Sequence, residues 1–387
     1  MLDQVSTSRR VAFVLSGLGP GGAEGVIAKI SERLVQADFD VTVIAFDRPD
    51  QPVFHAFHEN VRLIRLALPP VRSRLGGPAN IIRRFLRLRR TLRRERFDVV
   101  ISFLTKINAL TLAASAGTGT PVIVSERNNP LLQPNNRLWS LVLKPLYPRA
   151  HAIVLLTDAS RSCLPPRERT RAVVIRNPAA PLPFELLGAD GTRCVGVGRL
   201  TRQKGFDLLI TAFSRIADRF PDWELVIWGE GPDRPLLEAQ VRQLGLEGRV
   251  TLPGVTAKPG AWVESAAMLV LSSRYEGGPN VVIEAMATGL PVIATRCDFG
   301  PSELIDDGQD GLLVPPEDPE ALASAMARMM ADRRLRAELA SAGHRRMIAD
   351  ASIDRVVGQW VDVIGSALRS RASEHHRSEP AEAIASS

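Results

Sequence analysis

Two glutamates in the second half of the chain carry the clearest chemical signal. The segment 273–287 reads Ser-Arg-Tyr-Glu-Gly-Gly-Pro-Asn-Val-Val-Ile-Glu-Ala-Met-Ala, with Glu276 before a Gly-Gly-Pro turn and Glu284 on a predicted helix. Amides in the first turn of a helix have no partner inside that helix, so residues near Asn280 can bind an anion. Carboxylates accept hydrogen bonds from hydroxyl groups. The segment therefore predicts a site for a ligand that carries both an anion and hydroxyl groups.

A second loop supplies cations of the kind that bind phosphates. Arg199 and Lys204 lie between two glycines, after the predicted strand 195–197 and before a predicted helix. Arginine offers a planar fork of donors and lysine a compact charge, so the two side chains can converge on one anion. The following helix N-terminus favours the same ligand. We therefore predict that Arg199 and Lys204 bind a phosphate-bearing ligand.

The first half of the chain has a glycine-rich loop of its own. Gly17-Leu18-Gly19-Pro20-Gly21-Gly22 follows the predicted strand 11–15 and precedes a predicted helix, as in dinucleotide-binding domains. Pro20 and the residues after the loop differ from that motif. Three interpretations stay open, namely a phosphate or sugar site, a nicotinamide site in which Asp47 binds the ribose, and a structural turn.

Short apolar runs alternate with amphipathic stretches, which predicts a doubly wound α/β fold. The pattern restarts near residue 192, so we expect two Rossmann-like domains, at 1–176 and 192–370, with a cleft between them. We expect a linker at 177–191, a last helix that crosses back to the first domain, and a disordered tail at 371–387. Ligands in such sheets bind at the carboxyl ends of the strands. The predicted strands are 11–15, 41–45, 99–103, 122–124, 152–156, 195–197, 225–228, 250–252, 268–272 and 292–294, and the predicted helices are 23–36, 80–96, 206–220, 234–244 and 281–288.

The composition is typical of a globular protein in a reducing compartment. The chain has 387 residues, of which 45% are hydrophobic and 24% charged, and its three cysteines are too few for a disulfide framework or a Cys-based zinc site. No apolar run approaches the length of a membrane span. The net charge of +7 is divided unevenly, with 27 Lys and Arg against 13 Asp and Glu in residues 1–180, and 22 against 29 in residues 181–387. The opposite signs suggest two domains with different partners.

The predicted helix 80–96 is basic and amphipathic. Its apolar residues include Ile81, Phe85 and Leu92. Two interpretations stay open, a surface helix packed on the sheet and a helix that lies against anionic lipid. Nucleic acid is not an expected partner, because no nucleic-acid-binding motif accompanies the charge and aromatic residues make up only 5% of the chain. The arginines of this helix are Arg83, Arg84, Arg87, Arg89, Arg90, Arg93, Arg94 and Arg96.

The paired glutamates resemble the signature of a known family. Glu276 and Glu284, in an E-G-G-P-N-x-x-x-E-A-M-A setting, are similar to the E-x7-E motif of retaining GT-B glycosyltransferases of family GT4. The resemblance extends to the loop at 21–24, the segment 228–232 and the segment 308–315. It implies an enzyme that moves a hexose or N-acetylhexosamine from a nucleoside-diphosphate sugar, with UDP as the expected nucleotide, to a growing glycan. It also implies that no metal and no further cofactor take part.

The same resemblance assigns roles to individual residues. Arg199 and Lys204 would hold the diphosphate, and Glu284 would bind the ribose hydroxyls. Glu276 would contact the donor sugar, with help from the backbone of the loop that follows it. The donor-binding residues implied in this way are Gly22, Arg199, Lys204, Gly277, Gly278, Asn280, Val281 and Glu284.

One segment departs from the family. Many members carry a histidine after a late strand of the first domain, where this chain has Ser125-Glu126-Arg127-Asn128. This segment resembles a subgroup that builds bacterial surface polysaccharides and lipid-linked oligosaccharides, whose acceptor is commonly a polyprenyl-diphosphate glycan at the inner membrane face. Glu126 and Arg127 are therefore candidates for catalysis, and a structural pair is the alternative. The implied location is cytoplasmic, with peripheral binding to the membrane.

Two further classes of function stay open from the sequence. The missing histidine allows a nucleotide-binding scaffold that keeps the GT-B shape without catalysing transfer. The loop at 17–22 allows a nicotinamide-dependent oxidoreductase. Asp38-Phe39-Asp40 has the form of a D-x-D metal motif, but it falls between a predicted helix and a predicted strand, so we interpret it as a turn.

Overall fold

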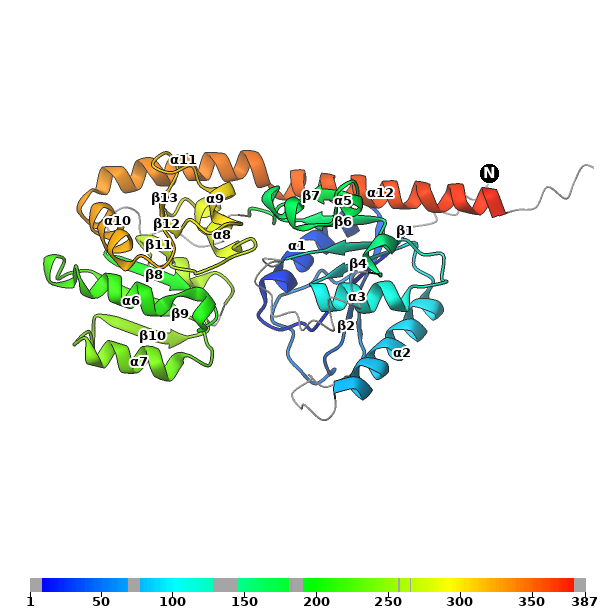
Figure 1. Ribbon diagram of the computed structural model, residues 1–387, viewed down its shortest axis with the longest axis horizontal. Coiled ribbons are helices and arrows are strands. Elements are labelled where there is room, and N and C mark those ends of the chain that lie inside the picture. The colour runs from blue at the N-terminus through cyan, green and yellow to red at the C-terminus, as the bar shows by residue number, and fades with distance from the viewer. Residues whose placement is uncertain are drawn as a thin grey trace, which may run out of the picture. The chain divides into compact units, whose positions relative to one another are not determined.

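The computed structural model describes residues 9–68, 77–127, 145–180, 182, 191–256, 258–264 and 266–378. The chain forms two compact units. The first unit contains the described residues up to Arg127, those from residue 145 to Ile175, and those from Asp354 onward. The second unit contains the described residues from Arg176 to Ile353. Figure 1 shows a parallel sheet flanked by helices in each unit.

The first unit is built on seven parallel strands in the order β3-β2-β1-β4-β5-β6-β7. Every residue of β4 and β5 is buried, as expected for strands covered on both faces. The sequence did not predict β3 and β7, which are short, lie at the two edges and are partly exposed. The strands are β1 (Arg9–Leu15), β2 (Phe39–Ala45), β3 (Arg62–Arg65), β4 (Val99–Phe103), β5 (Val122–Ser125), β6 (Ala152–Leu155) and β7 (Ala172–Val174).

Helices of the first unit come from distant parts of the chain. Two of them, α2 and α3, contact each other and contribute to one hydrophobic core, in which Leu88 and Leu112 are buried. Another helix, α12, begins at the end of the second unit and packs on the first, where Trp360 is fully buried and stacks on Phe103 of β4. The helices are α1 (Gly22–Gln36), α2 (Gly77–Glu95), α3 (Thr105–Ala114), α5 (Pro166–Arg169) and α12 (Ile353–Ser378), with 3₁₀ turns η1 (Tyr147–Arg149) and η2 (Ala159–Cys163).

The second unit has six parallel strands in the order β10-β9-β8-β11-β12-β13. One hydrophobic cluster joins the sheet to α6, α7 and α10, and another joins it to α8, α9 and α11. The strands are β8 (Arg193–Val197), β9 (Glu224–Trp228), β10 (Val250–Gly254), β11 (Met268–Leu271), β12 (Val292–Thr295) and β13 (Leu312–Val314). The helices are α6 (Phe206–Ser214), α7 (Arg234–Gln243), α8 (Asn280–Thr288), α9 (Pro301–Leu304), α10 (Pro319–Ala331) and α11 (Arg333–Ala351).

The prediction of two doubly wound α/β domains is therefore confirmed. In each sheet the order of the strands reverses once, between β1 and β4 in the first unit and between β8 and β11 in the second. Ligands in open α/β sheets bind at such switch points. The loop at 17–22 follows β1, the loop with Arg199 follows β8, and the loop with Glu276 follows β11. The topology thus places the predicted phosphate-binding loops where ligands are expected.

The segment after residue 370 differs from the sequence prediction. Helix α12 continues to Ser378, although the sequence analysis places a disordered tail from residue 371. The reason is a tertiary contact, because the Arg371 guanidinium donates to the Asp98 carboxylate at 2.9 Å and to the Phe97 carbonyl at 3.1 Å. Residues 379–387 and most of the predicted linker lie outside the described residues. Within the described part of the chain, no helix is both long and apolar enough to cross a membrane.

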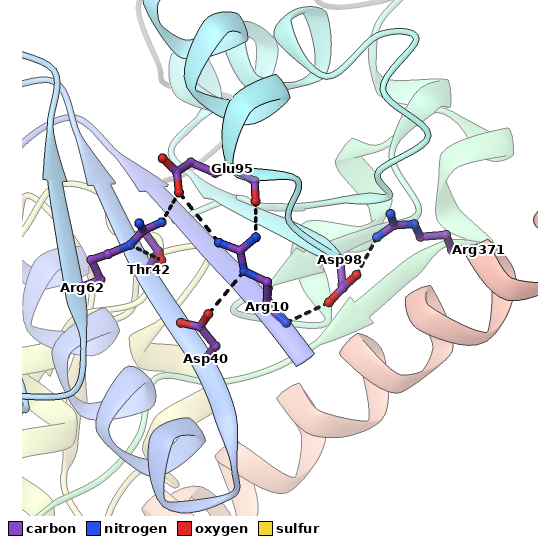
Figure 2. A network of polar contacts seen from close by, with 7 residues as sticks. All are labelled: Arg10, Asp40, Thr42, Arg62, Glu95, Asp98 and Arg371. Atoms are coloured by element: carbon purple, nitrogen blue, oxygen red, sulfur yellow. Dashed lines mark hydrogen bonds and ion pairs between the residues drawn. The ribbon is translucent and has the colours of Figure 1, made fainter. Parts of the chain in front are cut away.

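A network of charged side chains connects α12 to the starts of β1 and β4. Asp98 accepts hydrogen bonds from Arg371 and from the backbone amide of Arg10, and Figure 2 shows that Arg10 also reaches Glu95 at the end of α2. The carboxylate of Glu95 binds Arg62 of β3 as well as Arg94. Hydrogen bonds from Arg62 and Arg94 hold the pKa of Glu95 below its usual value. The network joins segments that the hydrophobic core alone does not align.

We predict that Glu95→Gln destabilises the first unit in a pH-dependent way. The pKa of Glu95 is lower in the folded protein than in the unfolded chain, so its ionised form stabilises the fold at neutral pH. The variant should lose about 1–2 kcal/mol of unfolding free energy at pH 7, because the cations of the network are partly in solvent. The difference from the wild type should shrink below about pH 4. Urea unfolding at pH 7 and at about pH 2.5, well below the usual pKa of a glutamate, measures this.

The matched control is Glu59→Gln, since Glu59 is an exposed glutamate in the same unit. This variant should unfold like the wild type at both pH values. A loss in the Glu95 variant that is equal at pH 7 and at about pH 2.5 would contradict the role given to the ionised carboxylate.

Candidate functional site

A buried ion pair lies at the switch point of the second unit. Glu276, in the loop between β11 and α8, is only 5% exposed. Its Oε1 atom accepts a hydrogen bond from the ammonium of Lys204 at 2.6 Å and another from the hydroxyl of Ser273 at 2.6 Å. Lys204 lies in the loop after β8. The structure therefore brings together two residues that the sequence analysis assigns to donor binding.

Close backbone packing sets the position of Lys204. The next residue, Gly205, has a φ of 62°, and a Cβ atom there would lie 2.1 Å from the carbonyl oxygen of Ser272. Only glycine fits this position without displacing the backbone. The Ser272 hydroxyl also donates to the carbonyl of Lys204 at 2.9 Å. The loops after β8 and β11 are thus held against each other at the residues that carry the ion pair.

The loop with Arg199 rests on the segment that follows β9. A Cβ atom on Gly229 would lie 1.8 Å from the carbonyl oxygen of Gly198, so these backbones touch. The amide of Leu200 donates to the carbonyl of Glu230 at 2.9 Å. Arg199 itself is exposed on the loop. The glycines of segment 228–232 therefore have a structural role, because they allow the close packing that fixes the backbone on both sides of Arg199.

Helix α8 begins directly after Glu276. Gly277, Gly278 and Pro279 precede it, and the side chain of Asn280 in its first turn accepts a hydrogen bond from Asn177. The amides of this first turn, which includes Val281, are the ones that the helix itself does not use. Glu284 is half-buried on the same helix. All donor-binding residues predicted for the second domain therefore lie on the loops after β8 and β11 or on α8.

Three residues of this site carried no assignment from the sequence. Ser273 binds Glu276, Asn177 binds the first turn of α8, and Arg274 binds Asp207 with two hydrogen bonds of 2.8 and 2.7 Å. Ser273 and Arg274 both belong to the segment 273–287. The partner of Ser273, Glu276, is three residues further along this segment, whereas the partner of Arg274, Asp207, lies on α6. For Asn177 the sequence offers no signal. The hydrogen bonds from Arg274 lower the pKa of Asp207.

The glycine-rich loop of the first unit is held by an acidic side chain. The Asp47 carboxylate forms an ion pair with Arg65 at 2.7 Å and accepts a hydrogen bond from the amide of Leu18 at 3.0 Å. Asp47 thus stabilises the loop, which argues against the ribose-binding role in the nicotinamide interpretation. Gly22 is the first residue of α1. Burial lowers the pKa of His55, whose ring contacts the carbonyl of Gly21 at 3.1 Å.

Glu126 is the centre of a buried polar cluster at the end of β5. Its carboxylate accepts hydrogen bonds from Thr105 at 2.6 Å, from Asn108 at 3.0 Å and from the phenol of Tyr147. Asn108 is fully buried and also binds the carbonyl of Ser125 at 3.1 Å. The cluster therefore fixes Glu126 with three neutral donors, and it draws α3 and η1 onto the end of the strand.

Arg127 has a different environment from Glu126. Its guanidinium lies over the ring of Phe103 at 4.3 Å and over the ring of Trp360 at 5.8 Å, distances at which cation–π attraction operates. Burial lowers its pKa to about 9. Arg127 thereby links β5 to α12. Asn128, the last residue of the segment, lies outside the described residues.

The D-x-D sequence at 38–40 covers the end of the turn after α1 and the first two residues of β2. Asp38 has a left-handed backbone with a φ of 61°, which is typical of a turn, and Asp40 pairs with Arg10 at 3.3 Å. Among the residues that the structure describes, no three His, Cys, Asp or Glu side chains are grouped as a metal site would require.

Comparisons with known proteins agree with this architecture. The model of the "Glycosyl transferase 4-like domain" matches residues 21–178, and that of "Glycosyl transferases group 1" matches residues 191–332. A relative from Campylobacter jejuni is 28% identical over 360 residues, which cover 92% of this chain and 98% of the relative. It is named GalNAc-alpha-(1->4)-GalNAc-alpha-(1->3)-diNAcBac-PP-undecaprenol alpha-1,4-N-acetyl-D-galactosaminyltransferase.

Solved structures share the fold at low sequence identity. Sucrose-phosphate synthase from Thermosynechococcus elongatus superposes with a TM-score of 0.81 at 21% identity, covering 94% of this chain and all of that one. HepE from Anabaena, solved in complex with UDP and glucose, superposes with a TM-score of 0.74 at 19% identity, covering 92% and 99% of the two chains. The architecture of both units therefore has solved counterparts along nearly its whole length.

We predict that Tyr147 stays protonated far into the alkaline range. Its burial and the neighbouring charge of Glu126 raise the pKa of Tyr147 well above its usual value. Tyr147→Phe should therefore leave the tyrosinate absorbance unchanged in a titration up to about pH 10. Glu126→Gln should lower the pKa of Tyr147, because it removes the carboxylate charge. A loss of tyrosinate signal in the Tyr147→Phe variant below this pH would contradict the buried cluster.

Proposed function

This chain belongs to the glycosyltransferases with the GT-B fold, and we propose that it acts on a lipid-linked glycan. The reaction would move a hexose or N-acetylhexosamine from a nucleoside-diphosphate sugar, with UDP as the nucleotide, to a growing glycan on polyprenyl diphosphate. The name of the Campylobacter relative describes an acceptor of this kind, and the structure of HepE was solved with UDP. We also propose that the configuration at the sugar carbon is retained and that no metal ion takes part.

The single observation that carries the proposal is the buried contact between Lys204 and Glu276 beside the start of α8. Lys204, with Arg199 and the first amides of α8, would stabilise the diphosphate as its bond to the sugar breaks. Glu276 would bind hydroxyl groups of the sugar, and Glu284 would bind those of the ribose. These roles use each group in its ordinary chemical capacity at one switch point.

The first unit would bind the acceptor. Glu126 and Arg127 follow β5 at the carboxyl end of the sheet, where ligands of such folds bind. The three donors on Glu126 suit a carboxylate that is held in one orientation. We therefore propose that Glu126 orients the acceptor. Arg127 would hold the end of β5 in place through its contacts with the rings of Phe103 and Trp360. Gly22, the first residue of α1, would bind the donor as the resemblance implies.

Transfer can be tested directly with purified protein. UDP release should require both a UDP-sugar from a panel and an undecaprenyl-diphosphate glycan, and nuclear magnetic resonance of the product should show an α-linkage from an α-linked donor. Binding of UDP without transfer to any acceptor would instead favour a nucleotide-binding scaffold. Failure to bind any nucleoside diphosphate or nucleotide-sugar in calorimetry would contradict the proposal.

The ion pair predicts opposite effects of the two glutamates on UDP affinity. Glu276 neutralises the charge of Lys204, so Glu276→Gln should strengthen UDP binding, because the full charge of the ammonium then acts on the diphosphate, while it lowers turnover. Glu284→Gln should weaken UDP binding about tenfold or more, because a charge-assisted hydrogen bond to the ribose contributes roughly 1.5–3 kcal/mol. Calorimetry with UDP and steady-state kinetics with the UDP-sugar measure the two effects.

Thermal unfolding should show that both variants are folded at 25 °C, where the comparison is made. Glu276→Gln should melt at a lower temperature than the wild type, because it leaves the largely buried ammonium of Lys204 without its charged partner. Weaker UDP binding in the Glu276 variant would show that Lys204 is not restrained by this carboxylate. Unchanged UDP binding in a folded Glu284 variant would remove Glu284 from the site.

The arginines of α2 divide into two groups, and one group supports membrane binding. Arg89 donates to the carbonyls of Ala114 and Ala116 at 3.0 and 2.8 Å, and Arg84 lies over the ring of Phe46 at 5.0 Å, so both have structural contacts. By contrast, two apolar side chains that are more than half exposed share one helical face with three exposed arginines. We call Ile82, Arg83, Leu86, Arg90 and Arg93 the α2 face.

The α2 face has the composition of a surface that binds anionic lipid. Its exposed isoleucine and leucine can enter the boundary between headgroups and acyl chains, while the arginines meet the lipid phosphates. A lipid-linked acceptor would be presented at such a surface. We therefore propose that the α2 face holds the enzyme on the cytoplasmic side of the inner membrane.

We predict salt-sensitive sedimentation with vesicles of phosphatidylglycerol and phosphatidylcholine. Replacing Arg83, Arg90 and Arg93 by Gln should weaken the binding about tenfold or more, since each cation near the surface contributes about 1 kcal/mol. The matched control replaces Arg242, Arg328 and Arg345, which are exposed in the second unit, and should bind like the wild type. Equal losses in the two triple variants, or a wild type that ignores the vesicles at low salt, would contradict the proposal.

A further inference from the structure

The two loops that carry the ion pair form one assembly through their backbones. Besides the contact of Gly205 with Ser272, the amide of Arg274 donates to the carbonyl of Gln203 at 2.8 Å. The side chain of Gln203 in turn donates to the carbonyl of Tyr275 at 3.1 Å. These contacts lie on either side of Lys204 and directly before Glu276 in the sequence. A shift of one loop would therefore change the distance between the ammonium and the carboxylate.

The side chain of Arg274 fastens this assembly to the rest of the unit. Its guanidinium binds both carboxylate oxygens of Asp207 in the first turn of α6, at 2.8 and 2.7 Å. It also binds Glu317, after β13, at 2.9 Å and the carbonyl of Arg202 at 2.9 Å. The side chain is only 13% exposed. One side chain thus connects segments that follow β8, β11 and β13.

We propose that Arg274 is a positioning residue that sets the geometry of Lys204 and Glu276 for the donor diphosphate. The inference rests on the proposed function, and it adds a residue that acts on the donor through Lys204. The planar fork of arginine matches a carboxylate and the neighbouring carbonyl at once, which a lysine cannot do. Misplacement of a reacting group by about 1 Å can cost about a hundredfold in rate. A side chain that fixes two loops can therefore control turnover without contact to the ligand.

The charges of this cluster keep it intact near neutral pH. The hydrogen bonds with Asp207 raise the pKa of Arg274, and the same bonds lower the pKa of Asp207. Both partners are therefore ionised where the enzyme would work. The groups that face the guanidinium are the carboxylates of Asp207 and Glu317 and the carbonyl of Arg202.

The test is the coupling between Arg274 and Lys204 in donor kinetics. Arg274→Gln should lower kcat/KM for the UDP-sugar about tenfold or more in the wild-type background. In a Lys204→Met background the same change should lower it less than about threefold, because the group that Arg274 positions is already gone. Arg274→Lys should recover only part of the loss. Equal losses in the two backgrounds, or wild-type kinetics in a folded Arg274→Gln variant, would overturn the inference.

Two further variants test whether the effect depends on the contacts of Arg274 and not on the loss of any ion pair in this unit. Glu317→Gln removes one bond to a carboxylate that is 60% exposed, so it should fold and should lower kcat/KM by at most about fivefold, with the same dependence on Lys204. Arg193→Gln removes a comparable ion pair with Glu224, of 3.0 Å, at the start of β8 and should leave the kinetics unchanged. If the wild type binds no UDP, the proposed function fails and this inference with it. If the wild type is active but the coupling is absent, only this inference fails.

Discussion

The backbone contact between Gly205 and Ser272 is the constraint on which the site of the second unit depends. It brings the loops after β8 and β11 so close that residue 205 has no room for a side chain. A lysine and a glutamate that are far apart in the sequence thereby meet at 2.6 Å in a buried setting. The cost of burying each charge is offset by the other, and by the hydroxyl of Ser273. The carboxylate of Glu276 thus has a cation and a neutral donor on one of its oxygens, and the pair as a whole carries no net charge.

At the end of β5, the first unit stabilises a buried carboxylate in a different way. Glu126 is buried without a cation among the three side chains that donate to its carboxylate, so neutral donors from α3 and η1 supply the hydrogen bonds. Arg127, one residue later, is stabilised by aromatic rings of β4 and α12. The two neighbouring residues therefore fasten different elements to β5. This division explains how a short segment at the end of one strand organises a helix, a 3₁₀ turn and the last helix of the chain.

The sequence predicted the elements with strong local patterns and missed those that depend on distant partners. Apolar runs located ten of the strands. Of the strands that were missed, β3 begins and ends with an arginine, and β7 and β13 have only three residues each. The spacing of Glu276 and Glu284 singled out the loop between β11 and α8, where the structure places the contact of Glu276 with Lys204. The partners of Glu126 could not be predicted, because Asn108 and Tyr147 come from other parts of the chain and meet the carboxylate only in the folded unit. The same holds for Arg274 and Asp207, which are 67 positions apart.

The return of α12 to the first unit has a consequence for biosynthesis. Trp360 is fully buried against Phe103, so the core of the first unit is completed by residues that follow the whole second unit in the sequence. A ribosome that synthesises the protein releases the strands of this unit long before it reaches α12. The second unit, whose described residues run without interruption by the other unit from Arg176 to Ile353, is synthesised completely before α12. The nascent first unit must therefore wait, with the site of Trp360 uncovered, until the whole second unit and α12 have been made.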